Sequence, residues 1–439
     1  MTNGLLSMAV LGPFCAIRKH AAFCCITMAI SCTLFSTTFA GESTANWQPP
    51  GQSPASQTSD GVQATTALLS GDATRTEFRL RMTKGVTAEV FTLANPYRII
   101  IDLPDVSFRL PDATGTKGQG LITAFRYGQF AEGKARIVLD AARPVLIEKA
   151  GMTALPQGQG VELAIVLNPT NEQTFGSGTG AARSEQDTVA AAPAPSAPNN
   201  VKPVILIDPG HGGIDGGAVG SPNLIEKHVV LAVAKELQRQ LNKTNRYDVR
   251  LTRSADVFIS LDRRLKLSRD QAADLFISLH ADAIADPQFM PLVRGATVYT
   301  LSERASDEQA RLMAEKENAS DRIAGLDTST ADSGGEVKGI LIDLMKRETA
   351  NFSADFSTML TGSLKKTVRL SRDPQRSAAF KVLKQTGAPS VLLELGYLSH
   401  VEDQKLLGST EWQRTIATSI TSAIDRFFAK RNAGAVNAP

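Results

Sequence analysis

Two histidines that follow apolar segments are the residues of this chain best suited to chemistry. His211 lies in the glycine-rich sequence IDPGHGGIDGG, directly after the apolar residues 204–207. His280 ends the apolar run 275–279. Open α/β sheets collect their functional groups at the carboxyl ends of strands, so we expect the two imidazoles to converge. Two histidines and one carboxylate would form a metal site with a position left open for water and substrate.

Glu226 is the carboxylate best placed to be the third ligand. It stands in the first turn of a helix that we predict over 225–241. One face of this helix is apolar and carries Val229, Val233, Leu237 and Leu241. The helix dipole would favour a glutamate at this position even without a metal, which is the alternative interpretation. Because the helix follows the His211 loop directly, it returns Glu226 towards the same strand ends.

Glu394 is a further candidate because it lies inside the apolar sequence VLLELGY, residues 391–397. Burying a carboxylate costs on the order of several kcal/mol unless a charged or hydrogen-bonding group meets it. One interpretation is structural pairing with an arginine. The other, which we favour, is a general base at a strand end beside the metal.

The remaining features of these segments are expected to be structural. His228 is two positions beyond Glu226 and points off its face, and His400 lies in a loop without a strand-end position. The glycine-rich turn lacks the Gly-Lys-Ser/Thr ending of a phosphate-binding loop, and Asp215 replaces the last glycine of a dinucleotide fingerprint. Nucleotide binding is therefore not expected.

The first 40 residues resemble an export signal. They contain Arg18 and Lys19, an apolar run over 21–35 and the small-residue sequence Thr38-Phe39-Ala40, with no acidic residue. This pattern predicts a signal peptide cleaved after Ala40, since the apolar run is short for an uncleaved anchor. No Arg-Arg pair precedes the run, which favours the Sec route. We therefore expect a periplasmic protein without a stable membrane anchor.

Cysteine usage and charge narrow the possible functions. All four cysteines lie inside the predicted signal peptide: Cys15, Cys24, Cys25 and Cys32. A metal site in the mature chain must therefore use His, Asp or Glu, and residues 29–31 before Cys32 match a lipobox poorly. Without the two basic residues of the signal, 45 basic residues face 44 acidic ones, a formal charge of +1. This balance gives no electrostatic case for nucleic-acid binding.

The chain of 439 residues is long enough for two folded units. After a flexible leader over 41–60, short segments with period-two apolar spacing recur over 61–169, which predicts an all-β sandwich domain. Residues 170–201 are rich in Gly, Ala, Ser, Pro and Gln and are predicted to be a linker. Over 202–430 strand-like and helix-like windows alternate, which predicts an α/β domain with a sheet flanked by helices. Residues 431–439 are left as a tail.

One stretch of the second domain breaks this alternation. Residues 303–365 show no strand signal, and 303–322 is a polar helical run, ERASDEQARLMAEKENASDR, with Leu312 and Met313 as its only large apolar side chains. Such a helix is either a solvated face or an element that covers something.

Together these segments resemble a known enzyme family. IDPGHGGIDGGA, Glu226 downstream, FISLHADA, ILIDLMKRET, AAFKVLK and PSVLLELGYLS resemble, in order over 204–428, the zinc-dependent type-3 N-acetylmuramoyl-L-alanine amidases. The β domain resembles the AMIN domain, best over RTEFRLRMTKGVTAEVFTLANPYRIIIDLP. The order AMIN, linker, amidase is characteristic of periplasmic cell-separation amidases.

The resemblance implies a ligand set and a reaction. Residue by residue, it makes His211, Glu226 and His280 the Zn²⁺ ligands and Glu394 the catalytic carboxylate. It implies hydrolysis, in peptidoglycan, of the amide between N-acetylmuramic acid and L-alanine. One small departure is His400, where the family commonly has Asn.

The resemblance also gives the polar helix a meaning. Division amidases of this family carry an insert that blocks the zinc site until a LytM-type activator displaces it. By this analogy Glu317, or failing that Glu315, would occupy the open position of the zinc, and 303–365 would be the autoinhibitory region. A solvated helix without a regulatory role is the alternative.

Two other functions remain possible from the sequence. The same ligand set could serve another zinc hydrolase of cell-wall substrates, such as a peptidase or deacetylase, although no HExxH helix supports a peptidase. The chain could also be a silent peptidoglycan-binding scaffold, against which the presence of Glu394 with all three ligands argues.

Overall fold

A computed structural model describes most of the chain beyond the predicted leader. It describes residues 61–111, 114–175, 202–220, 224–284, 288, 290, 292–326, 340–385 and 387–436. All of these belong to one of the two units of the chain, Ser56–Pro439. The predicted signal peptide and leader, and the linker beyond residue 175, lie outside the described residues. Within the described part, no helix is long and apolar enough to cross a membrane.

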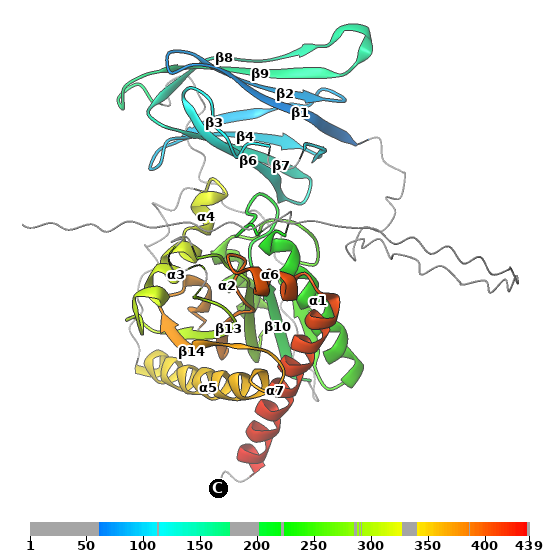
Figure 1. Cartoon of the computed structure of the whole chain (residues 1–439), viewed down its shortest axis with the longest axis vertical. Coiled ribbons are helices and arrows are strands. Elements are labelled where there is room, and N and C mark those ends of the chain that lie inside the picture. The colour runs from blue at the N-terminus through cyan, green and yellow to red at the C-terminus, as the bar shows by residue number, and fades with distance from the viewer. Residues whose placement is uncertain are drawn as a thin grey trace, which may run out of the picture. The chain divides into compact units, whose positions relative to one another are not determined.

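The N-terminal β region folds as two stacked sheets, as predicted (Figure 1). One sheet has the order β5-β1-β2-β9-β8 and the other the order β3-β4-β7-β6. The strands are β1 Val62–Gly71, β2 Thr76–Met82, β3 Glu89–Leu93, β4 Arg98–Pro104, β5 Val106–Phe108, β6 Ile122–Ala131, β7 Lys134–Ala141, β8 Val145–Ala154 and β9 Val161–Pro169. Alternate residues of β2 enter the core between the sheets, whereas β4 is buried on both faces.

The second region is built on one mixed six-stranded sheet, which agrees with the predicted α/β class. Its order is β11-β10-β12-β15-β13-β14, in which β11, β10, β12 and β15 run parallel and β13 is antiparallel to β15. The strands are β10 Val204–Pro209, β11 Asp248–Leu251, β12 Leu275–His280, β13 Ala296–Leu301, β14 Leu370–Ala378 and β15 Ser390–Glu394. Because β10, β12 and β15 are parallel neighbours, the loops that follow them meet at one edge of the sheet.

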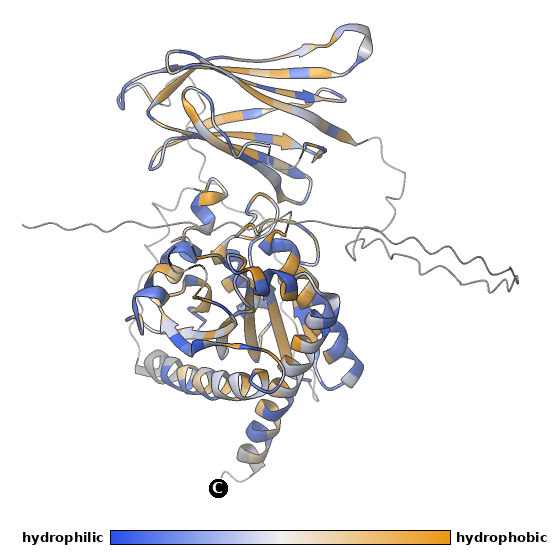
Figure 2. Ribbon diagram, in the orientation of Figure 1, coloured by the Kyte–Doolittle hydropathy of each residue, from blue (hydrophilic) through white to orange (hydrophobic). Residues whose placement is uncertain are grey.

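Helices cover both faces of this sheet. The helices are α1 Glu226–Thr244, α2 Leu261–Asp270, α3 Glu308–Asn318, α4 Ser320–Ile323, α5 Ile340–Leu364, α6 Val401–Leu407 and α7 Thr410–Val436. One core cluster joins the sheet to α1, α5 and α7, and a second joins it to α2 and α3. Figure 2 shows largely hydrophobic central strands, flanked by helices that carry both hydrophilic and hydrophobic residues. The last helix continues to Val436, so most of the predicted tail is helical.

The predicted insert consists of two parts with different roles in the fold. In α5, Phe356, Leu360 and Leu364 are completely buried in the same core cluster as α1 and α7. In contrast, α3 buries Ala310, Met313 and Ala314 against the opposite face of the sheet. The core role of α5 is hard to see in the sequence because the helix follows a long polar segment. Among the described residues of the insert, the polar element near the strand ends is therefore α3 with α4.

We expect Phe356→Ala to destabilise the α/β region, because α5 belongs to its core. Removing this ring should lower the free energy of unfolding by about 3–5 kcal/mol, measured by urea denaturation. Asn351→Ala is the matched control, since Asn351 is exposed on the same helix and should change stability by less than about 0.5 kcal/mol. Equal stabilities of the two variants would contradict a core position for α5.

Candidate metal centre

The loop between β10 and α1 holds His211 in a backbone conformation that few residues other than glycine adopt. Its φ is 57°, in the left-handed region. Two buried arginines hold the backbone of this loop. Arg264 donates to the carbonyls of Pro209 and His211, and Arg253 donates to those of Pro209 and Gly210. These charge-assisted hydrogen bonds replace the regular partners that an irregular backbone lacks.

Glycines in this loop allow the candidate ligands to approach one another closely. A Cβ on Gly210 would lie 2.5 Å from the His280 ring, and one on Gly217 would lie 2.6 Å from Glu226 Oε2. Both distances are far below ordinary van der Waals contact. The glycine richness around His211 thus serves close packing of side chains and not phosphate binding.

Glu226 is completely buried and is oriented by two backbone amides. Its Oε2 accepts from the amide of Ala218 at 2.8 Å, and its Oε1 accepts from that of Ala281 at 2.8 Å. These donors come from the loops after β10 and β12. The carboxylate is therefore held between the two histidine-bearing segments.

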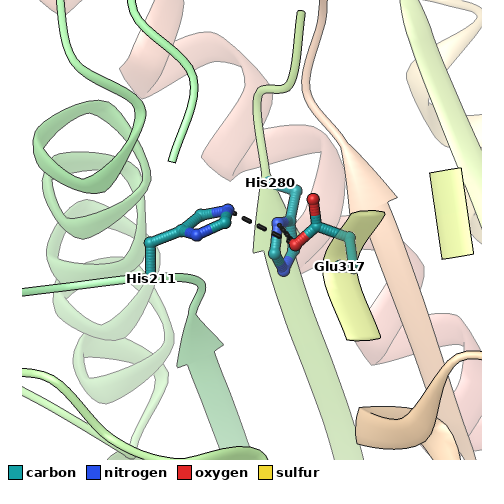
Figure 3. Close-up of side chains that lie close together, drawn as sticks. All are labelled: His211, His280 and Glu317. Atoms are coloured by element: carbon teal, nitrogen blue, oxygen red, sulfur yellow. Dashed lines mark ion pairs between the residues drawn. The ribbon is translucent and has the colours of Figure 1, made fainter. Parts of the chain in front are cut away.

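Two carboxylates contact the same two imidazole nitrogens. Glu226 Oε1 lies 3.3 Å from both His211 Nε2 and His280 Nδ1. Glu317 Oε2 lies 3.4 Å and 3.2 Å from the same two nitrogens. Figure 3 shows the two imidazoles and the Glu317 carboxylate pointing at one another from the β10 loop, from β12 and from α3.

The distances between the histidine nitrogens and the carboxylate oxygens are those of ligands that share one metal ion. Zinc takes nitrogen and oxygen ligands at about 2.0–2.2 Å in tetrahedral sites, which sets neighbouring ligand atoms about 3.3–3.5 Å apart. Neither His211 Nε2 nor His280 Nδ1 makes a hydrogen bond within the described part of the chain, although both are buried. His211, His280 and Glu317 form a group that could hold a metal ion, and Glu226 Oε1 contacts the same two nitrogens. Imidazole and carboxylate donors of this kind suit zinc.

Asp215 determines which nitrogen of His211 faces the two carboxylates. Its Oδ2 lies 2.9 Å from His211 Nδ1, which favours the proton there and leaves Nε2 with a lone pair. Burial raises the pKa of Asp215, but the interactions with His211 and Ser320 outweigh burial and lower it to about 2. Burial would lower the pKa of His211, yet Asp215 and Glu226 raise it well above its usual range. The cluster thus holds an excess of negative charge that a bound cation would neutralise.

Comparisons with known proteins identify the family of the chain. The family described as N-acetylmuramoyl-L-alanine amidase matches residues 205–426, and the AMIN domain matches residues 69–165. The first match covers half of the chain and contains every residue of the cluster. The chain belongs to the type-3 N-acetylmuramoyl-L-alanine amidases. It carries an AMIN domain before the amidase domain.

Named relatives extend the match beyond the amidase domain. N-acetylmuramoyl-L-alanine amidase AmiA of Escherichia coli is 38% identical over 52% of this chain and 76% of its own length. AmiC of Neisseria meningitidis is 31% identical over 83% of this chain and 90% of its own length. Among solved structures, AmiC2 of Nostoc punctiforme is 28% identical, with a TM-score of 0.35, over 52% of this chain and 98% of that chain.

Glu394 lies next to the cluster in the amidase domain. It is paired with His280 across parallel strands β15 and β12, so the two side chains share one face of the sheet. Its Oε2 accepts from the amide of Asp282 at 3.0 Å. Complete burial, and then the charges of Asp282 and Glu226, raise the pKa of Glu394 well above its usual range. No arginine pairs with Glu394 among the described residues. This part of the chain therefore does not show the structural pairing with an arginine that the sequence also allowed.

Of the other residues singled out in the sequence, Glu317 lies at the cluster, whereas Glu315, His228 and His400 do not. Glu315 is exposed and pairs with Arg311 on the outer face of α3, whereas Glu317 is buried, so only Glu317 reaches the cluster. His228 is more than half exposed and lies 3.5 Å from Asp256. His400 caps α6 by accepting from the amide of Glu402. Both histidines therefore have the structural positions that the sequence predicts.

Three polar contacts of the amidase domain were not anticipated from the sequence. Asp215 lies four residues after His211, a spacing that could have indicated its role. Ser320 donates to Asp215 at 2.5 Å, and Lys316 pairs with the buried Asp282. These contacts join α3 and α4 to the loops of the cluster, and periodicity along the chain does not reveal them.

We expect Asp215→Asn to weaken Zn²⁺ binding by about 10–100-fold. The amide keeps the size of the side chain but removes the charge that orients His211 and holds its proton on Nδ1. Competition with a chromogenic chelator measures the affinity. His228→Ala is the control and should bind zinc as the parent chain does. An unchanged affinity of the Asp215→Asn variant would show that Asp215 does not orient the ligand.

Proposed function

We propose that the chain is a zinc-dependent hydrolase of the amide between N-acetylmuramic acid and L-alanine in peptidoglycan. The observation that carries the proposal is the convergence of His211 Nε2, Glu226 Oε1 and His280 Nδ1 on one point beside Glu394. Family membership supports the substrate, since the relatives are named for this reaction.

In this proposal His211, Glu226 and His280 hold the zinc ion. A bound zinc would supply Lewis-acid polarisation of the scissile carbonyl and make water a stronger acid. Glu394 takes the proton of the attacking water and delivers it to the amide nitrogen, which leaves as the amine of L-alanine while the lactyl group becomes a carboxylate. The Asp282 amide fixes Oε2 of Glu394, so Oε1 is the oxygen that exchanges the proton. A raised carboxyl pKa suits a group that must both accept and donate a proton near neutral pH.

We further propose that α3 and α4 block this site. Glu317 Oε2 lies 3.4 and 3.2 Å from the two histidine nitrogens and would take the ligand position that water and substrate need. The space that remains beside the two histidines is a cavity of about 10 Å³, which has room for about one water molecule and excludes a muramyl peptide. The ion pair of Lys316 with Asp282 and the hydrogen bond of Ser320 to Asp215 hold Glu317 on both sides.

The proposed setting is the periplasm during cell separation. The AMIN domain and the relatives named AmiA and AmiC support an exported, wall-directed enzyme, and the predicted signal peptide would be removed after Ala40. A LytM-type activator is the proposed partner that displaces α3. Blocking by default suits such an enzyme, because uncontrolled cleavage of the wall would lyse the cell.

The chain without residues 1–40 is expected to hydrolyse peptidoglycan slowly until Glu317 is removed. Glu317→Ala should raise the rate at least about 10-fold, equivalent to about 1.4 kcal/mol, and Glu315→Ala should not change it. Mass spectrometry of material released from purified sacculi should find stem peptides with a free N-terminal L-alanine. A chelator should abolish this release and zinc should restore it. Release of other fragments, or release that resists chelation, would refute the proposed reaction.

Glu394→Gln, introduced into the Glu317→Ala chain, is expected to lower the hydrolysis rate by about 10²–10⁴-fold. The amide cannot accept the water proton, but it keeps the hydrogen bond to Asp282. Zinc content and melting temperature should remain those of the parent. A variant that still cuts the wall at the parent rate would remove Glu394 from the mechanism.

A further inference from the structure

Segment 322–326 follows the proposed blocking helix and packs against the AMIN domain. Three arginines from three strands of the β3-β4-β7-β6 sheet donate to four consecutive carbonyls of this segment. Arg98 donates to Arg322 O at 2.5 Å and Arg126 to Ile323 O at 2.7 Å. Arg136 donates to Ala324 O and Gly325 O, each at 3.3 Å. We call Arg98, Arg126 and Arg136 the arginine cluster.

The arginine cluster is preorganised by the sandwich itself. Arg136 makes two hydrogen bonds to Asp102, at 2.6 and 2.8 Å, and its guanidinium stacks on the Phe130 ring with 3.5 Å to the centroid. Arg126 makes two hydrogen bonds to Asp140, at 2.8 and 2.7 Å. Because these guanidinium groups are fixed before the segment docks, little side-chain freedom is lost on contact.

Apolar packing surrounds these polar contacts. Ala324 is completely buried in a cluster that contains Ile100 and Val138 of the sandwich and Ile214 and Phe258 of the amidase domain. A Cβ on Gly325 would lie 2.6 Å from Ile100 Cδ1, so the backbone itself rests on the sheet. This contact explains why β4 is buried on both faces. The β3-β4-β7-β6 sheet therefore provides both hydrogen-bond donors and apolar contacts for segment 322–326.

The same surface also touches the loop of the metal centre. The amide of Phe258 donates to Gln129 O at 3.3 Å, and a Cβ on Gly128 would lie 2.5 Å from the amide nitrogen of Ile214. Ile214 is three residues from His211 in sequence. One sheet thus contacts both the ligand-bearing loop and the end of the segment that carries Glu317.

We propose that the AMIN domain holds the blocking helix closed through the arginine cluster. This inference rests on the proposed role of Glu317. The four carbonyls lie within eight residues of Glu317 along the chain, so α3 and α4 cannot leave the metal centre far without breaking these hydrogen bonds. The AMIN domain is then a regulatory partner of the catalytic domain, in addition to any role in binding the wall. Opening the site requires an activator to loosen this contact as well as the Glu317 contact.

The test uses the chain without residues 1–40 and compares two arginine variants. Arg126→Met removes the donor to Ile323 O and should raise activator-free hydrolysis of sacculi about 10-fold. Arg81→Met is the matched control, since Arg81 also pairs with a carboxylate, that of Glu162, but on the other sheet. It should leave the rate unchanged. Hydrogen exchange should show lost protection over 308–323 in the first variant only.

A second variant changes the other side of the contact. Ala324→Asp places a charge in the apolar cluster and should also raise the basal rate, whereas Leu312→Asp, at an exposed position of α3, should not. Neither substitution changes the main apolar core of the sandwich or of the amidase domain. Circular dichroism melting verifies that the variants fold. In a Glu317→Ala background, Arg126→Met should add less than about 2-fold, because the block is already released.

The outcomes separate this inference from the proposed function. Activation by Glu317→Ala, with parent-like rates for both Arg126→Met and Ala324→Asp, would overturn the role of the AMIN domain and leave blocking by Glu317 intact. No activation by Glu317→Ala would overturn the block and, with it, this inference. Activation by all three variants, and by neither control, is the expected result.

Discussion

The excess of buried negative charge around His211 and His280 is the constraint on which the rest of this structure depends. Glu226 and Glu317 meet the two imidazoles directly, and Asp215, Asp282 and Glu394 lie around them. So many carboxylates in one buried place are unfavourable without a cation. The parallel alignment of β10, β12 and β15 gathers these groups, and the arginines below the β10 loop fix the backbone that carries them. The fold thus concentrates charge that a bound cation would balance.

The same charge is the physical basis of the proposed block by α3 and α4. Lys316 forms an ion pair with Asp282, and the Ser320 hydroxyl donates a hydrogen bond to Asp215. Burial, opposed mainly by Lys316, still leaves the pKa of Asp282 raised to about 6. These two contacts of α3 and α4 therefore use groups that already lie at the metal centre. This lets α3 be mostly polar, with Met313 and two alanines as its buried apolar side chains.

The sequence was informative where function is local and less so where it depends on distant contacts. Strand ends, glycine spacing and the first turn of a helix indicated His211, Glu226, His280 and Glu394 as candidates, and the α/β class and the β sandwich were predicted correctly. The sequence already placed Glu317 before Glu315, but it left both open, because both lie on one polar helix and only its packing decides which side faces inwards. The arginine cluster could not be predicted at all. Period-two patterns show one buried face of a strand, whereas β4 is buried on both, and its second partner lies more than 200 residues away in sequence.

A block of this kind must be strong enough to hold and weak enough to release. Moving a two-state equilibrium from 1:99 to 99:1 takes a differential affinity of about 5.5 kcal/mol, which is the scale that an activator must supply. One carboxylate ligand, one ion pair and a few charge-assisted hydrogen bonds amount to a comparable total, since each such hydrogen bond contributes about 1.5–3 kcal/mol. Distributing the block over contacts at both ends of α3 and α4 has a further consequence. In the proposed block, losing one contact through thermal motion leaves the others in place, so spontaneous opening would be rare and an activator would have to disrupt the contacts at both ends.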